Sequence, residues 1–360
     1  YCIAMDPRVK ELIDRLESQH SLSEAEYTEL LQKRDASAAD LLAQKAVEAR
    51  KRFYKTDVYV RGLIEFSNTC KNDCFYCGIR CGNKKLLRYR LDTEELIACT
   101  ERGYELGFRT FVLQSGEDPF FSDDILCPFI SWLRKRHPDC AVTLSIGERS
   151  RDSYQRLFDA GAERYLLRHE TASKEHYGIL HPASMSFDRR MQCLRDLRDI
   201  GYAVGAGFMT GSPFQIEELL AKDLKFIEEF RPEMCGIGPF IPHRDTPFAD
   251  KSAGTAELTC YLLSIIRLIR PNILLPSTTA LNTICPDGWE RGIQSGANVV
   301  MPNITPKSVR KNYVLYNGKN SESGNNDEEN VSCIALLEKR MQAIGYRVAL
   351  GRGDIRQLEK

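Results

Sequence analysis

The sequence predicts an α/β fold, a (β/α)8 TIM barrel with an N-terminal helical extension and a C-terminal helix. Eight short runs rich in β-branched and aromatic residues recur along the chain, and amphipathic stretches of helical length separate most of them. Such linkers suit right-handed crossovers between parallel strands. Polar or Gly-rich segments follow the runs, and in a closed barrel the carboxyl ends of all strands meet at one mouth. An open doubly wound sheet has a similar rhythm but would spread these segments along a line.

Residues 1–52 are expected to form the helical extension, as two or three helices. Glu, Leu, Ala, Lys and Arg dominate this part of the chain, and Val9, Leu12 and Leu16 recur at helical spacing. The segment LSEAEYTELL contains the Ser-x-x-Glu pattern of a capping box, which predicts that a helix begins there.

The barrel is expected over residues 53–316. Its predicted strands are 58–66, 110–114, 141–146, 164–168, 203–208, 234–238, 273–277 and 298–302. The predicted helices between them begin near Thr93, Ser122, Ser150, Phe187, Gln215, Thr255 and Asp287. Residues 317–360 are expected to form an acidic surface loop, SESGNNDEEN (321–330), and an amphipathic helix that closes the barrel.

The charge balance argues against nucleic acid and membranes as partners. The chain has 50 Lys+Arg and 50 Asp+Glu, so no global field attracts nucleic acid or an anionic membrane. No apolar run approaches the roughly 18 residues of a membrane span. We expect a cytoplasmic protein. An organellar location stays open, because the chain starts without Met and a removed targeting segment is compatible with that start.

Four of the 13 cysteines crowd one short stretch, NTCKNDCFYCGIRC. A structural zinc site usually has two separated pairs of ligands, and disulfide frameworks belong to small secreted domains. A redox pair at Cys74 and Cys77 leaves Cys70 unexplained. Three closely spaced thiolates suit an iron–sulfur cluster, since soft sulfur ligands select it. We interpret Cys81 as a bystander, because a fourth protein ligand would close the site to an external one.

The spacing C-x3-C-x2-C, with an aromatic residue before the last Cys, is the fingerprint of radical S-adenosylmethionine (SAM) enzymes. The chain resembles the biotin synthase type of that superfamily, and most closely the FeFe-hydrogenase maturases. The resemblance extends from about residue 52 to residue 316, and the strings QSGEDP, RHETA and GPFIPH carry it most specifically. It implies a 4Fe–4S cluster held by Cys70, Cys74 and Cys77, with SAM chelating the fourth iron.

The resemblance also implies a set of SAM contacts. They are Tyr76, Gln114, Ser115, Gly116, Ser145, Glu170, Arg190, Gly205 and Gly207. A glycine lets backbone approach a ligand closely, and we expect Gly205 and Gly207 to press against the nucleoside. Arg190 is expected to pair with the SAM carboxylate through its guanidinium fork.

A substrate cavity is expected deeper in the barrel. Arg164 and Arg168 are four residues apart on one predicted strand and therefore share a face. They predict a cationic seat for an anionic group; the alternative is an ion pair within the barrel, with Glu170 or Asp118. The residues expected to line the cavity are Arg61, Thr143, Arg164, Arg168, Thr278, Thr279, Ala280, Met301, Tyr313 and Tyr316.

The function that the resemblance implies is reductive cleavage of SAM, giving a 5′-deoxyadenosyl radical. That radical would act on a cysteine-bound iron–carbonyl–cyanide unit during assembly of the hydrogenase H-cluster. The implied partners are the other maturases, a tyrosine lyase and a GTPase scaffold. Only Cys333 follows the barrel, so no second cluster is expected, and the lone His243 is interpreted as structural. The alternatives are a lysine mutase that makes methylornithine and a non-catalytic iron–sulfur carrier.

Overall fold

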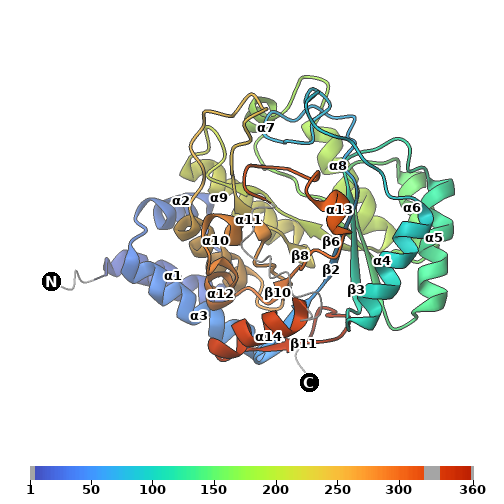
Figure 1. The fold of residues 1–360 in the computed structure, drawn as a ribbon. Helices are drawn as coiled ribbons and strands as arrows, with labels where there is room; N and C mark the ends of the chain where they lie inside the picture. Colours follow the sequence, from blue (N-terminus) through green and yellow to red (C-terminus); the bar gives the residue numbers. More distant parts are fainter. Residues whose placement is uncertain (1–4, 320–332, 358–360) are drawn as a thin grey trace.

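The computed structural model describes residues 5–319 and 333–357, which form a barrel of parallel strands surrounded by helices (Figure 1). The chain begins with α1 (Pro7–Gln19), α2 (Glu24–Gln32) and α3 (Ala36–Tyr54), so the helices expected before the barrel are present. The predicted capping box opens α2: the Ser23 hydroxyl and the Glu26 carboxylate each accept the other's backbone N–H. These helices pack on the barrel's outer ring, α2 on α9 (Glu217–Phe230) and α3 on α10 (Ala256–Ile269).

Six parallel strands form the main sheet of the barrel. In order they are β2 (Gly62–Ser67), β3 (Thr110–Ser115), β4 (Ala141–Ser145), β5 (Arg164–Leu166), β6 (Ala203–Ala206) and β8 (Met234–Cys235). The single bridges Met234↔Leu274 and Pro276↔Val299 continue the ring through the predicted strand 273–277. The ring then closes through β10 (Val299–Val300), which pairs with β1 (Asp57–Val60). The predicted barrel is therefore confirmed.

The predicted runs 58–66 and 234–238 each divide between two strands, and the run 203–208 is longer than the strand that it contains. The run 58–66 splits at Arg61, because β1 pairs with β10 and the C-terminal β11 (Arg347–Ala349) while β2 pairs with β3. The run 203–208 ends at β6, and β7 (Met209–Thr210) pairs instead with β9 (Gly238–Pro239) in a small separate sheet.

Helices cover the outside of the barrel as predicted. They are α4 (Thr93–Glu105), α5 (Asp123–Arg136), α6 (Arg151–Asp159), α8 (Phe187–Ile200), α9, α10 and α12 (Gly288–Gln294). Three short helices that the sequence did not predict lie in the connections after strands. They are α7 (Lys174–Leu180), α11 (Thr279–Ile284) and α13 (Lys307–Arg310).

The alternation of side chains along β2 separates the core from the barrel interior. Ile64 and Phe66 belong to the large core between strands and helices. Glu65, between them, therefore points to the inside of the barrel. It pairs in register with Gln114 on β3, which pairs with Ser145 on β4, so these three polar residues share one layer.

The C-terminal segment closes the amino end of the barrel. The predicted closing helix is present as α14 (Cys333–Ala343), and the unpredicted β11 adds a strand beside β1. Both lie at the end of the barrel opposite to α7 and the loops around the mouth (Figure 1). The predicted acidic loop 321–330 falls outside the described residues. In the parts of the chain that are described, no helix has both the length and the apolar character needed to cross a bilayer.

Candidate active site

The cysteine loop lies at the mouth of the barrel, directly after β2. Cys70, Cys74 and Cys77 all carry free thiols. The loop is fixed by backbone bonds to other parts of the mouth: Lys71 N–H donates to the Glu117 carbonyl at 2.9 Å, and Gly78 N–H donates to the Leu315 carbonyl at 2.8 Å. Three thiols are thus presented by one anchored loop.

Burial raises the pKa of all three thiols, that of Cys77 to about 12. The neighbouring cysteines raise it further at Cys74 and Cys77, because their thiolates would repel one another. A thiolate trio of this kind needs a bound cation to become stable. Half-buried sulfur donors that are close enough to affect one another's pKa fit an iron–sulfur cluster in the chemistry they offer. Cys81 lies on the same loop and is close enough to Cys70 to influence its pKa.

Glycines permit the tight packing of this loop. A Cβ on Gly116 would lie 2.3 Å from the Thr69 carbonyl oxygen and 2.7 Å from Cβ of Cys70. A Cβ on Gly78 would lie 2.1 Å from the Val314 carbonyl oxygen. Gly116 therefore has a packing reason to be glycine, beside the ligand contact that the sequence predicted.

A chain of charged groups runs beside the thiols. The Arg190 guanidinium donates to Glu148 Oε1 at 2.6 Å and to the Arg168 carbonyl at 2.7 Å. Arg168 Nη2 lies 3.1 Å from Glu170 Oε2 without hydrogen-bond geometry, so both atoms remain without a hydrogen bond among the described residues. Glu170 and Arg190 are both near enough to shift the pKa of the Cys74 thiol.

Glu170 has a strained backbone. Its φ of +67° is in the left-handed region, which side chains other than glycine rarely adopt. The side chain is buried, and its backbone N–H donates to the Gly207 carbonyl at 3.0 Å. Strain of this kind gathers at functional sites, where the surroundings hold it in place.

Further predicted SAM contacts lie around the same mouth. Gln114 Nε2 donates to the Tyr313 hydroxyl at 3.3 Å. The Ser115 hydroxyl donates to the neighbouring Gly116 carbonyl at 2.6 Å, and half-buried Ser145 ends β4. The Tyr76 hydroxyl bonds to His181 Nε2 at 3.2 Å.

Gly205 and Gly207 have structural reasons of their own. A Cβ on Gly205 would lie 2.3 Å from the Leu166 side chain, and one on Gly207 would lie 2.0 Å from the Gly236 carbonyl oxygen. With φ at +153°, Gly207 also has a backbone that favours glycine. Close packing of strands explains both glycines, so their predicted contact with the nucleoside stays a prediction.

Arg164 and Arg168, predicted to form one anion-binding site, lie at different levels of the barrel. Arg168 pairs with Glu170 at the mouth, whereas Arg164 Nη2 donates to Asp354 Oδ1 at 2.7 Å and to the Arg352 carbonyl at 2.8 Å at the floor. The ion-pair alternative therefore describes both arginines. The predicted Asp118 partner is wrong: Asp118 pairs with Arg90 at 2.7 Å.

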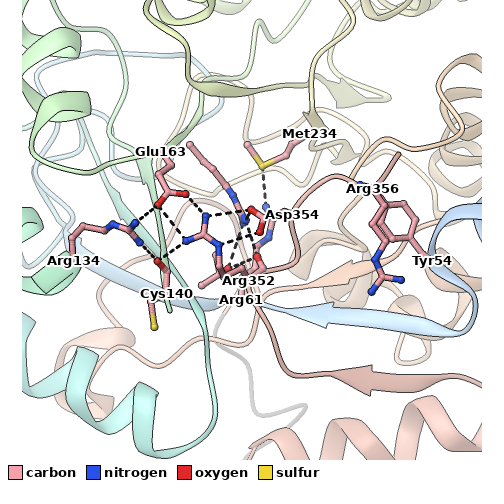
Figure 2. Close-up of polar contacts among 11 residues, drawn as sticks. Tyr54, Arg61, Arg134, Cys140, Glu163, Met234, Arg352, Asp354 and Arg356 are labelled. Atoms are coloured by element: carbon pink, nitrogen blue, oxygen red, sulfur yellow. Dashed lines mark hydrogen bonds and ion pairs between the residues drawn. The ribbon is translucent and has the colours of Figure 1, made fainter. Parts of the chain in front are cut away.

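Figure 2 shows this floor, where Arg352 donates to both Glu163 and Asp354 and where Arg61 reaches toward Met234. Arg61 Nη1 lies 3.1 Å from Met234 Sδ, and its Nε and Nη2 have no hydrogen-bond partner in the described ranges. Burial and the nearby Arg164 lower the pKa of Arg61 to about 9.

The other predicted cavity residues fall into two groups. Thr143 and Met301 lie toward the floor: Thr143 pairs in register with Arg164, and Met301 packs on a small core that includes Tyr54, Tyr59 and Met234. Thr143 Oγ1 is buried without a hydrogen bond among the residues described. The second group, at the mouth, is Thr278, Thr279, Ala280, Tyr313 and Tyr316.

Glu65 and Lys319 are interior residues that the sequence analysis missed. The Glu65 side chain is fully buried, and Lys319 Nζ contacts its Oε1. Asn303 Nδ2 donates to the other carboxylate oxygen at 2.7 Å. A carboxylate in the middle of an apolar strand is unusual, and that signal was available at Glu65. A cavity of about 330 Å³ also lies on the rim beside Lys71 and Glu117, outside the barrel interior.

Comparison with known proteins identifies the family. A model described as the radical SAM superfamily matches residues 64–227. The FeFe hydrogenase maturase subunit HydE of Thermotoga maritima is 40% identical over 338 residues, which cover 94% of this chain and 95% of that protein. The chain belongs to the HydE family of radical SAM enzymes. This confirms the predicted resemblance and the prediction of an enzyme.

More distant relatives of this HydE-family enzyme include a methylornithine synthase and a second hydrogenase maturase. The 3-methylornithine synthase of Methanosarcina barkeri is 27% identical over 93% of each chain. A crystal structure of methylornithine synthase matches with a TM-score of 0.81 at 25% identity and covers 94% of this chain and 97% of that one. The maturase HydG matches with a TM-score of 0.79 at 19% identity, covering 96% and 77%, which shows a common fold. Radical SAM membership implies a 4Fe–4S cluster and SAM as cofactors.

Proposed function

We propose that this HydE-family enzyme cleaves SAM at a 4Fe–4S cluster held by Cys70, Cys74 and Cys77. Its substrate is proposed to be a cysteine-bound iron–carbonyl–cyanide unit on the way to the FeFe-hydrogenase H-cluster. The observation that carries the proposal is a trio of half-buried free thiols on one anchored loop, above a barrel interior that contains the Arg61 guanidinium, whose Nε and Nη2 have no hydrogen-bond partner among the described residues. When bound, the cluster and SAM supply a 5′-deoxyadenosyl radical.

The protein's own part is to bind and orient SAM at the mouth. Arg190 is proposed to pair with the SAM carboxylate, which its hydrogen bonds to Glu148 and to the Arg168 carbonyl support by holding the guanidinium in position. The Glu170 carboxylate has an unbonded oxygen for the ribose or the sulfonium. Gln114, at the same level of the barrel as Ser145, is proposed to contact the methionine amine.

The substrate is proposed to lie below SAM, inside the barrel. Arg168 and Arg61 offer buried N–H groups to an anion, and Thr143 offers a buried hydroxyl. Arg164 contributes less than the sequence suggested, because Asp354 already neutralises it. The closed floor keeps water away from the interior, which favours a controlled radical reaction.

The partners and the cofactor count belong to the proposal as well. We propose that a tyrosine lyase maturase supplies the substrate and that a GTPase scaffold receives the product. A single cluster is proposed, because Cys333 is the only cysteine of the described chain after the barrel. The cytoplasmic location stays a prediction.

Anaerobic reconstitution followed by reduction with dithionite tests the cluster assignment. Cys74→Ala is expected to lose both bound iron and 5′-deoxyadenosine, whereas Cys127→Ala, a half-buried cysteine on α5, keeps both. Equal activity of the two variants would contradict the assignment.

Maturation assays test the substrate. The unaltered enzyme is expected to support activation of apo-hydrogenase by the other maturases, and its omission is expected to abolish it. A lysine mutase would instead convert lysine to methylornithine. This is the second candidate function, because the chain is 27% identical to a methylornithine synthase.

A further inference from the structure

The Glu65 carboxylate lies inside the barrel, and hydrogen bonds fix the backbone that carries it. Its backbone N–H donates to Thr305 Oγ1 at 2.8 Å, and its carbonyl accepts from the Tyr89 hydroxyl at 2.6 Å. Its side chain is fully buried one strand away from Gln114. A buried charge in this position needs a partner, since burying an unpaired carboxylate is strongly unfavourable.

Lys319 supplies that partner from outside the barrel strands. It ends the segment 312–319, here termed the strap, which lies over the mouth and accepts the Gly78 N–H bond at the Leu315 carbonyl. The Lys319 side chain is only 6% exposed, contacts Glu65, and lies over the Tyr313 ring at 4.7 Å from its centre. The ammonium is thus brought inside the barrel by the same strap that holds the cysteine loop.

The Lys319 ammonium changes the net charge of the barrel interior. Three ion pairs run from mouth to floor: Arg168–Glu170, Lys319–Glu65 and Arg164–Asp354. Arg61 is a buried cation with no carboxylate partner in the described part of the chain. With Lys319 in place, these side chains therefore carry one net positive charge, that of Arg61. Without Lys319, the negative charge of Glu65 would offset the positive charge of Arg61.

We propose that Lys319 determines specificity for an anionic substrate by neutralising Glu65. The inference rests on the proposed function, because it takes the barrel interior as the substrate chamber. A free carboxylate at Glu65 would repel an anion, and the low dielectric of the interior would strengthen that repulsion. Lys319 removes the repulsion, so that Arg61, which has no carboxylate partner in the described chain, and the unbonded Nε of Arg168 can bind the ligand.

Binding of L-cysteate, an inert sulfonate analogue of cysteine, tests the proposal by calorimetry on the reconstituted SAM-bound enzyme. Lys319→Gln is expected to weaken binding roughly tenfold or more. Glu65→Gln is expected to bind at least as tightly as the unaltered enzyme, and the double variant is expected to return close to it. Lys319→Arg retains the charge and should bind normally. Lys311→Gln, an exposed lysine near the start of the strap, is the matched control.

Two results would overturn the proposal. Unchanged binding by Lys319→Gln would show that its charge does not matter, and a double variant as weak as Lys319→Gln would assign the loss to a damaged strap. If Lys319→Gln does not fold, Glu65→Gln alone decides, because weaker binding or none in that variant contradicts the charge argument. Failure of the proposed function would appear separately, as absence of SAM cleavage in the unaltered enzyme.

Discussion

Replacing Arg168 with alanine should weaken substrate binding while leaving SAM cleavage intact. Arg168 Nη2 faces Glu170 Oε2 at 3.1 Å, whereas the buried Nε has no hydrogen bond within the described chain and is available to an anionic ligand. A hydrogen bond to a charged group contributes about 1.5–3 kcal/mol. Loss of one such contact should therefore raise KM for the substrate roughly 10- to 150-fold. Arg190 bonds to the backbone carbonyl of Arg168, which alanine retains, so SAM cleavage without substrate should persist.

The assay compares 5′-deoxyadenosine formed without substrate with substrate consumed, in Arg168→Ala and the unaltered enzyme. Arg195→Ala, an exposed arginine on α8, controls for the loss of a positive charge. A parallel fall in SAM cleavage and in substrate turnover would refute the reasoning, since it would mean that Arg168 holds the mouth together through Glu170.

Three further predictions concern stability. Gly207→Ala, whose new Cβ would lie 2.0 Å from a carbonyl oxygen, should destabilise the apoprotein by about 3 kcal/mol or more in urea unfolding, while Gly178→Ala, with open space around it, should be neutral or stabilising. Burial lowers the pKa of His181 to about 3, so it stays neutral in the fold while the unfolded chain binds a proton below about pH 6.5. The free energy of unfolding should therefore fall as pH drops from about 6.5 toward 3, by about 2 kcal/mol at pH 5. The same dependence on pH in the unaltered enzyme and in His181→Gln would contradict this. Asp354→Asn should lower stability by about 1–3 kcal/mol and loosen the floor in hydrogen exchange, because it leaves Arg164 buried with a weaker partner; unchanged exchange would contradict the assignment.

Strand runs were the most predictable feature of the fold. They are buried on both faces, so their β-branched composition is continuous and easy to recognise. Short α7 and α11 escaped prediction because seven and six residues show too little periodicity. The split at Arg61 could not be foreseen either, since it depends on β11, which arrives from the far end of the chain.

Arg164 and Arg168 illustrate the limit of predicting a site from spacing. Alternation would put residues four apart on one face, about 13 Å apart along a strand, but β5 ends at Leu166 and Arg168 lies beyond it. One arginine consequently serves the floor and the other the mouth. Lys319 was beyond reach for a related reason: it lies 254 positions from Glu65 in sequence, and no local pattern indicates that the strap folds back into the barrel.

Paramagnetic resonance of the reduced, reconstituted enzyme tests most directly whether the loop of Cys70, Cys74 and Cys77 leaves one iron open for SAM. Adding SAM labelled with ¹⁷O in its carboxylate should change the cluster signal and introduce a coupling from the label in the unaltered enzyme. Identical spectra with and without SAM, or a loop occupied by zinc, would contradict the account.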